Sequence, residues 1–314
     1  MVATTTTRKR SAVGGALPPL TAWAFVLPAL VIFGVFVLYP MFTALSYSFF
    51  EWRGISRGAF VGLDNFVALF TREPYASDIP RAFGHNFLLF LAAMVVQNTL
   101  GLFMANLLHR LKRFKQLFQT LYTMPYLVSP LIVGYLWSLM LSPLFGPVNA
   151  LLRLIGLEQL ALPWLGDPAT AIWVVVLVTA WQWIGFPLLI YGAALGGIPH
   201  EIEEAASLDG ANAWQRFIWV VFPMILPIVG TVTVLTFVGA MEAFPIPYAL
   251  GGSSGSPAGA TDVMTLVFYR TSFESGATNA IGVSSAIAIV LFLVIFGFSM
   301  IFTRWFRRTE RKLF

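Results

Sequence analysis

The residues of this sequence that could take part in chemistry are few, and the densest acidic group lies between residues 199 and 217. Glu203 and Glu204 follow Pro199 closely, which is typical of a helix start, because proline suits the first helical position and the helix dipole favours acidic side chains in the first turns. Gly210 then allows a sharp turn with positive φ, and a second helix can restart just after it. An ordinary solvated acidic loop would explain the composition of this segment equally well.

The usual groups for catalysis or metal binding are missing from the sequence. It has no cysteine, which excludes disulfides, thiolate chemistry and cysteine metal sites, and His85, His109 and His200 lie far apart. No glycine is followed directly by lysine, so the Walker A motif is absent and the chain has no ATPase site of its own. We therefore expect no catalytic residue, no bound metal ion and no cofactor on this chain.

Long apolar runs dominate the rest of the chain. Of the 314 residues, 58% are hydrophobic and 11% are charged, whereas a soluble domain has about 25% charged residues. A helix of about 20 residues crosses the hydrocarbon core of a bilayer, and helices satisfy their own backbone groups there. Six apolar runs reach that length, at residues 20–50, 87–108, 118–141, 169–195, 218–241 and 281–303.

These runs predict an all-α membrane protein with six transmembrane helices. We expect a short cytoplasmic tail at residues 1–19, a membrane domain at 20–303 with the acidic loop at 199–217, and a basic cytoplasmic tail at 304–314. The net charge of +5 does not indicate nucleic acid, because the charged residues cluster at the ends of the apolar runs.

The lysines and arginines also predict the orientation in the membrane. If the N-terminus is inside, thirteen of the nineteen basic residues lie in inside segments and six in outside segments. Basic residues accumulate on the cytoplasmic side of membrane proteins, so both termini and the 199–217 loop are predicted to be cytoplasmic.

Two of the connecting segments contain signals for local structure. The first polar loop, residues 51–86, contains Asp64 and Asn65, either of which could cap the start of a helix. A later loop, residues 142–168, is punctuated by proline and glycine and is expected to hold a short interfacial helix at 148–155.

Three function classes compete: a passive half of an ATP-driven importer, an ion-coupled secondary transporter or channel, and an intramembrane enzyme. None of the six runs contains an Asp, Glu, Lys, Arg or His, whereas coupled transporters usually carry ionisable groups inside the membrane and hydrolysis needs an activated nucleophile or a metal. Gln97 and Asn98 lie inside the second run, and we interpret them as interhelical hydrogen-bonding groups. The first class is therefore favoured, with the ion-coupled transporter or channel as the alternative.

The acidic loop carries a longer motif that narrows the first class. The string that begins Glu204-Ala205-Ala206 and continues to Asp209 and Gly210, followed by Phe217, resembles the cytoplasmic EAA loop of binding-protein-dependent ABC importer permeases. In that family the loop forms a coupling helix that docks in a groove of the ATPase. The resemblance implies that these six residues couple the chain to an ATPase, with Glu204 and Gly210 foremost.

Further motifs resemble the sugar-permease branch of this family, and the likeness covers nearly the whole chain from the first run. They are the Gly62-Leu63-Asp64-Asn65 element, the break from Trp183 to Pro187, and the pair Gly251-Gly252 followed by Thr261. The chain departs from the branch in reading Gly-Gly-Ser where Gly-Gly-Pro is usual, and in lacking the large extracytoplasmic domain of the maltose subunit.

The resemblance implies a type I importer permease fold and a multi-pass position in the bacterial inner or plasma membrane. It also implies a set of partners: a second, similar permease subunit, two copies of an ATPase that bind ATP and Mg²⁺, and an external solute-binding protein that delivers a sugar or related polyol.

A path for the sugar is expected where the fourth run is broken. Transporters often bind substrate near the midplane at broken helices, and aromatic faces suit sugar rings while glycine allows close approach. The expected path consists of Trp183, Gly185, Phe186, Thr236, Ala240, Glu242 and Ala243. On the fifth run, Thr233, Thr236, Ala240 and Ala243 share one helical face, and close helix packing is the simpler explanation of such small residues. The family resemblance favours the sugar path.

Overall fold

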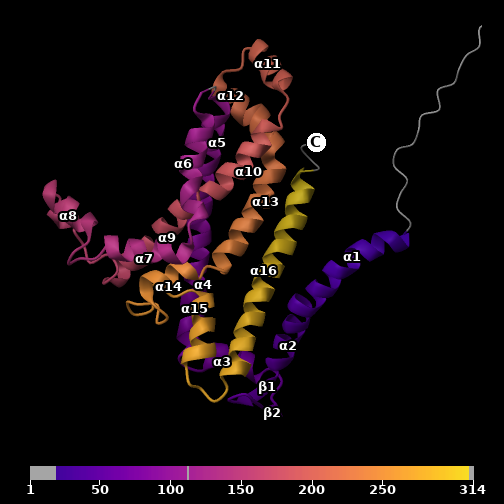
Figure 1. Ribbon diagram of the computed structural model, residues 1–314, viewed down its shortest axis with the longest axis vertical. Coiled ribbons are helices and arrows are strands. Elements are labelled where there is room, and N and C mark those ends of the chain that lie inside the picture. Colours follow the sequence, from indigo (N-terminus) through magenta and orange to yellow (C-terminus); the bar gives the residue numbers. More distant parts are fainter. Residues whose placement is uncertain (1–18, 112, 311–314) are drawn as a thin grey trace, which may run out of the picture. The chain divides into compact units, whose positions relative to one another are not determined.

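The computed structural model describes residues 19–111 and 113–310 (Figure 1). The chain divides into two compact units, residues 1–46 and residues 47–314. The tail expected at residues 1–19 lies almost wholly outside the described residues. In the part that is described, helices dominate and one two-stranded sheet is present.

The first unit is a helical segment with an apolar surface. It consists of α1 (Pro19–Phe33), the π-helical turn η1 (Gly34–Leu38) and α2 (Tyr39–Tyr47). Residues Trp23–Tyr47 are long and apolar enough to cross a membrane. Large side chains such as Phe25 and Phe36 are exposed, which suits lipid or another protein chain.

The second unit starts with a hairpin that is fastened by a buried asparagine. Strands β1 (Phe50–Arg53) and β2 (Ser56–Phe60) pair antiparallel, and α3 (Asp64–Thr71) follows. Neither Asp64 nor Asn65 caps α3, because its N-cap residue is Leu63. Asn65 is buried instead and donates to the carbonyl oxygens of Ser48 and Phe50 at 2.8 and 2.9 Å. The expectation of a side-chain cap was wrong, since this amide holds the hairpin.

The second membrane span is longer than its apolar run. Helix α4 (Tyr75–Ala92), the π-helical turn η2 (Ala93–Asn98) and α5 (Thr99–Arg110) form one span of 36 residues. The sequence predicted a polar loop that extends to residue 86. The structure corrects this prediction, because the last part of that segment, from Tyr75, belongs to α4. Charged residues misled that prediction because Asp78 and Arg81 are paired with partners rather than solvated in a loop.

The third apolar run is broken, not continuous as predicted. Helices α6 (Lys115–Leu127) and α7 (Pro130–Met140) are bent by 89°. The residue before a proline avoids the helical region, and Ser129 before Pro130 has φ −55° and ψ 126°. Beyond α7, the short helix expected at 148–155 is present as α8 (Pro147–Leu154), followed by the 3₁₀ turn η3 (Glu158–Leu160).

The fourth and fifth runs form the spans around the acidic loop. Helices α9 (Pro168–Trp183) and α10 (Gly185–Gly196) meet at Ile184, close to the expected break. After α11 (His200–Leu208) come α12 (Ala213–Arg216), the π-helical turn η4 (Phe217–Val221) and α13 (Phe222–Met241).

The remaining elements complete the bundle. They are α14 (Pro245–Gly251), α15 (Met264–Tyr269), the π-helical turn η5 (Arg270–Glu274) and α16 (Ala280–Glu310). Helix α16 continues through the described part of the basic segment that begins at residue 304. Five helices of the described residues are long and apolar enough to span a membrane, and the bent pair α6–α7 brings the number to six.

The spans of the second unit run between two ends that differ in content (Figure 1). Helices α11 and α12 lie at one, here called the α11 end, and the hairpin, α3 and α15 lie at the other, the hairpin end. Close packing between spans depends on small residues: a Cβ on Gly101 of α5 would lie 2.8 Å from Cγ of Pro187 on α10. Such approach through glycine is typical of membrane helices.

Candidate functional site

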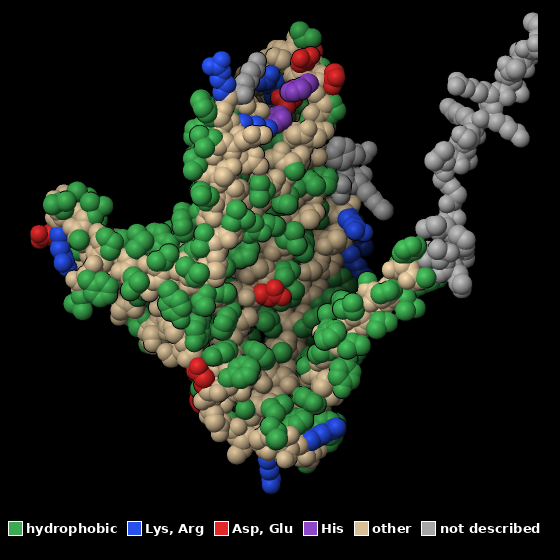
Figure 2. All heavy atoms as spheres, viewed as in Figure 1, with side chains coloured by type: hydrophobic (Ala, Val, Ile, Leu, Met, Phe, Trp, Pro, Cys, Tyr) green, Lys and Arg blue, Asp and Glu red, His purple; other side chains and the backbone are tan. Residues whose placement is uncertain are grey.

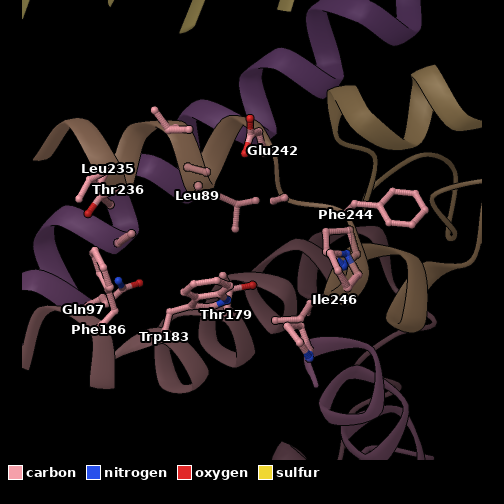
Figure 3. Close-up of a pocket in the computed structure, with 18 of the residues that line it drawn as sticks. Leu89, Gln97, Thr179, Trp183, Phe186, Leu235, Thr236, Glu242, Phe244 and Ile246 are labelled. Atoms are coloured by element: carbon pink, nitrogen blue, oxygen red, sulfur yellow. The ribbon is translucent and has the colours of Figure 1, made fainter. Parts of the chain in front are cut away.

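A cavity of about 400 Å³ lies in the second unit, between the η2–α9–α10 region and the junction of α13 with α14. Figure 3 shows Thr179, Trp183 and Phe186 on one side of it and Leu235, Thr236 and Glu242 on the other. Its volume suits a small ligand. The lining residues are Leu89, Ala93, Gln97, Tyr126, Pro130, Thr179, Trp183, Phe186, Leu235, Thr236, Val238, Gly239, Ala240, Glu242, Ala243, Phe244, Pro245, Ile246 and Pro247.

Six of the residues expected on the sugar path line this cavity, although they come from separate spans. They are Trp183, Phe186, Thr236, Ala240, Glu242 and Ala243. Gly185 does not line it. A Cβ at this glycine would lie 3.0 Å from both Cα of Thr123 and Cβ of Tyr126, so the glycine lets α10 approach α6 closely.

Aromatic rings form one wall of the cavity. The ring centroids of Tyr126 and Trp183 are 5.5 Å apart with the ring planes at 63° in an edge contact, and those of Tyr126 and Phe186 are 6.3 Å apart with the planes tilted by 46°. Edge-to-face contacts of this kind hold aromatic rings in place. The wall therefore offers a fixed apolar surface to the face of a ring-shaped ligand.

Polar groups on the cavity wall come from three elements. Asn98 of η2 donates from Nδ2 to Oγ1 of Thr236 on α13 at 3.1 Å, which confirms the interhelical role expected for Asn98. Its neighbour Gln97 lines the cavity instead. Thr179 also lines it, with its hydroxyl buried and without a hydrogen-bond partner among the described residues. A threonine hydroxyl in a helix has two accessible rotamers, so this group can turn toward a ligand.

Sequence reasoning missed Gln97, Tyr126 and Thr179 as lining residues. Thr179 lies four residues before Trp183 on the same helix, and residues at that spacing share a face, so this signal was available. Tyr126 belongs to the broken third span, whose position could not be inferred from a run that was taken to be continuous.

Glu242 is held at the cavity by the end of α13. It is the C-cap residue of this helix and is exposed. The residues before it are fixed by the buried Asn86, whose Nδ2 donates to the carbonyl oxygens of Ala240 and Met241 at 2.6 and 3.3 Å. The Oδ1 atom of Asn86 accepts from the backbone N–H of Met264 at 2.8 Å. The chain around the carboxylate is therefore anchored on both α4 and α15.

The acidic loop at the α11 end has the structure that its sequence predicts. Pro199 is the N-cap residue of α11, one position before the first helical residue at which the sequence placed it, and Gly210 has φ 83° with open space around the position of a Cβ. The second helix restarts behind Asn212, which forms a reciprocal capping box with Gln215. No residue of α11 is buried. This helix therefore presents most of its surface outward.

The six residues of the expected coupling motif are mostly accessible. Glu204, Ala205, Asp209 and Gly210 are exposed, whereas Ala206 and Phe217 are half-buried. One further contact ties α11 to the bundle. Nε2 of His109, at the end of α5, lies 3.6 Å from Oε1 of Glu203. Figure 2 shows that histidine and acidic side chains gather at this end of the unit.

A second charged group lies at the hairpin end, and it is largely buried. The Asp262 carboxylate is fully buried and accepts from both nitrogens of the Arg270 fork at 2.9 and 3.0 Å and from Arg81 at 3.2 Å. Asp78 bonds to the same two arginines. Hydrogen bonds to Asp262 are the main reason that the pKa of Arg270 is raised above its ordinary value. Among the described residues, no three His, Asp or Glu side chains are placed to hold a metal ion.

Comparisons with known proteins agree with this architecture. The sequence is 33% identical over 296 residues to the sn-glycerol-3-phosphate transport system permease protein UgpA of Yersinia enterocolitica, covering 93% of this chain and 94% of the relative. It is 29% identical over 294 residues to the lactose transport system permease protein LacF of Rhizobium radiobacter, covering 93% and 95% of the two chains.

Solved structures show the same fold. A bacterial ABC transporter involved in the import of the acidic polysaccharide alginate superposes with a TM-score of 0.78 at 24% identity, over 92% of this chain and 96% of the other. Residues 97–312 match the family described as binding-protein-dependent transport system inner membrane component. The chain belongs to this family of multi-pass membrane permease subunits of ABC transporters.

Proposed function

We propose that this chain is the membrane subunit through which a carbohydrate or related polyol passes in an ATP-driven importer. The observation that carries the proposal is the cavity formed by aromatic rings, neutral hydrogen-bonding groups and a single carboxylate. Trp183 and Phe186 suit the apolar faces of a sugar ring, and Gln97, Thr236 and Glu242 suit its hydroxyl groups. The substrate path then consists of the six expected residues that line the cavity, with Gly185 acting through packing.

The exposed face of α11 supports coupling to a separate ATPase. An acidic helix with no buried residue gains little by projecting from its own bundle, so a partner groove is the simplest reason for its form. Glu204, Ala205, Ala206, Asp209, Gly210 and Phe217 would meet the ATPase. That partner would bind ATP and Mg²⁺, and this chain would bind neither.

The assembly would contain a second permease subunit, two ATPase subunits and an external solute-binding protein. The last of these is supported by the similar alginate ABC transporter, whose crystal structure includes a periplasmic protein with alginate pentasaccharide bound. For this chain, the exposed apolar surface of Trp23–Tyr47 offers further area for lipid or a second subunit.

The basic residues support an orientation with the α11 end in the cytoplasm. Arg110 ends α5 beside the His109–Glu203 contact, and Arg307 and Arg308 lie in the last turn of α16. That part of α16 packs on α13, where a Cβ on Gly230 would lie 2.4 Å from the Phe306 ring. By the positive-inside rule, this end faces the cytoplasm.

The experiment that tests the sugar path uses the assembled importer in proteoliposomes. Trp183→Ala and Thr236→Leu should lower uptake while the stimulation of ATPase activity by the loaded binding protein is retained. The matched control is Trp173→Ala, because Trp173 lies on the same helix, outside the cavity, and is exposed. Normal uptake by both cavity variants would contradict the proposed path, and uptake driven by an ion gradient without ATP would contradict the proposed class.

The same preparation tests the orientation. The native chain has no cysteine, so single cysteines at the exposed Ser207 and Ser254 report without background. A membrane-impermeant thiol reagent should label the first only from the cytoplasmic side and the second only from outside. External labelling at Ser207 would exclude contact between α11 and a cytoplasmic ATPase.

A further inference from the structure

We infer that this cavity selects uncharged carbohydrates and polyols and rejects their anionic counterparts, such as uronates and sugar phosphates, through the carboxylate of Glu242. The inference rests on the proposed function and names the substrate class of the same cavity. It concerns a property on which the similar proteins differ, since glycerol 3-phosphate and alginate are both anionic, whereas lactose is neutral.

The wall of the cavity carries negative charge and no positive charge among the described residues. Of the described residues on its wall, Glu242 carries a charge and none is Lys, Arg or His. The carboxylate is exposed. It also follows the last turn of α13, where free carbonyl groups add partial negative charge.

The usual backbone site for an anion is weakened as well. Anions bind at helix N-termini through free N–H groups, and α14 begins at the cavity with Pro245, Ile246 and Pro247. The two prolines have no N–H to donate. The start of α14 therefore offers few donors to a phosphate or carboxylate, and α7, whose first residue Pro130 also lines the cavity, likewise begins with a residue that has no N–H.

The two arginines of the ion-pair group at the hairpin end do not compensate for this. Arg81 and Arg270 are both paired with Asp78 and Asp262. The guanidinium groups of these two arginines are thus engaged by carboxylates at their own end of the unit.

A neutral polyhydroxylated ligand meets no such penalty. Its hydroxyl groups can donate to the Glu242 carboxylate, which forms stronger hydrogen bonds than a neutral acceptor. Gln97 and Thr236 supply further groups, and Trp183 supplies a ring face. Two like charges a few ångströms apart in a partly enclosed site disfavour binding by about tenfold or more. The charge of a sugar therefore affects its affinity for the cavity more strongly than its shape does.

The test measures binding to the purified, assembled importer with two matched probe pairs, glucose against glucuronate and glycerol against glycerol 3-phosphate. Quenching of tryptophan fluorescence reports binding, and subtraction of the Trp183→Phe variant isolates the signal from the cavity. In the native complex each neutral probe should bind about tenfold more tightly than its anion. Glu242→Gln should reduce that ratio to within about threefold, and Glu242→Lys should reverse it.

Two controls keep the result interpretable. Glu158→Gln removes an exposed carboxylate outside the cavity and should leave the ratio unchanged. If a Glu242 variant does not fold, the salt dependence of binding to the native complex provides a second measurement. Raising the ionic strength from about 0.1 M to about 1 M shortens the Debye length from about 10 Å to about 3 Å. The affinity ratio between each neutral probe and its anion should then become smaller.

The outcomes separate this inference from the proposed function. Equal binding of neutral and anionic probes by the native complex, or a preference that survives Glu242→Gln, would overturn the charge selection and leave a sugar-binding cavity. Binding of neither member of any pair, with no Trp183-dependent signal, would count against the cavity itself as the sugar path.

Discussion

The two ends of the membrane bundle handle their charged residues in opposite ways. At the hairpin end, Asp262 is fully buried and its carboxylate is shared by Arg81 and Arg270. At the α11 end, Glu204 and Asp209 are exposed on a segment with no buried residue. Charges that are paired within the chain stabilise its own fold, whereas charges that are left exposed on a projecting helix are available to a partner.

The difference also appears in the backbone. The loop from Gly251 to Asp262 is packed so tightly that a Cβ on Gly255 would lie 2.4 Å from Oδ1 of Asp262, and one on Gly259 would lie 2.5 Å from the Arg81 guanidinium. Around Gly210, apart from its two chain neighbours, no described residue has an atom within 4 Å of such a Cβ. The hairpin end is thus closed around its ion pairs, and the α11 end is held mainly by local backbone geometry.

The largest effect is expected from breaking the buried ion pairs. Asp262→Ala leaves two arginines without their shared carboxylate, and removing one partner of a buried pair costs about 3–5 kcal/mol. The free energy of unfolding of the detergent-solubilised protein should fall by that amount. Glu204→Ala is the control, because an exposed substitution away from such features changes stability by less than about 0.5 kcal/mol. Equal losses for the two variants would remove the distinction between the two ends.

Much of the fold could be predicted because the membrane imposes a simple rule on length and composition. Five of the six apolar runs correspond to continuous candidate spans. The predicted span boundaries are wrong where charged residues are paired inside the protein or where a proline breaks a helix. The charged start of α4 was assigned to a loop because its partner, Asp262, lies far away in the sequence. The break at Pro130 was missed because the run contains no charge at all.

The candidate site was predictable in its motifs and less so in its surroundings. The turn at Gly210 and the residues Trp183, Phe186 and Thr236 follow from local sequence signals. Gln97 and Tyr126 reach the cavity through contacts between distant spans, which no local pattern encodes. Tertiary packing, and not propensity, decides those positions.

A moderate effect is expected from the turn after α11. Gly210 has φ 83°, and a residue with a Cβ loses about 1–2 kcal/mol in this left-handed region. Because there is open space around it, Gly210→Ala should destabilise the turn through backbone strain alone. Gly84→Ala is the matched control, since that glycine is helical and also has nothing within 4 Å, and the change should be neutral or stabilising. Hydrogen exchange of the amides on both sides of the turn measures the difference, and equal exchange in the two variants would contradict it.

A somewhat smaller effect is expected when the N-cap of α12 is removed. Asn212 accepts from the backbone N–H groups of Trp214 and Gln215 at 3.0 and 2.9 Å. Replacing such a cap with alanine costs about 1 kcal/mol, so Asn212→Ala should speed hydrogen exchange in α12. Asn212→Asp keeps the acceptor and should preserve the protection. Faster exchange in both variants to the same degree would show that the cap does not hold this helix.

The smallest effect on stability and the largest on coupling are expected at Glu204. The side chain is exposed, and no described residue forms an ion pair with it, so Glu204→Lys should change the free energy of unfolding by less than about 0.5 kcal/mol. In the assembled importer the same variant should hydrolyse ATP without moving sugar, because the reversed charge would face the ATPase groove. Glu158→Lys carries the same charge change at another exposed position and should transport normally. If Glu204→Lys transports at the native rate, the exposed acids of α11 are solvated surface, and the contrast between the two ends reduces to a difference in burial. If it is destabilised as much as Asp262→Ala, Glu204 contributes to the fold of this chain and not to a partner contact.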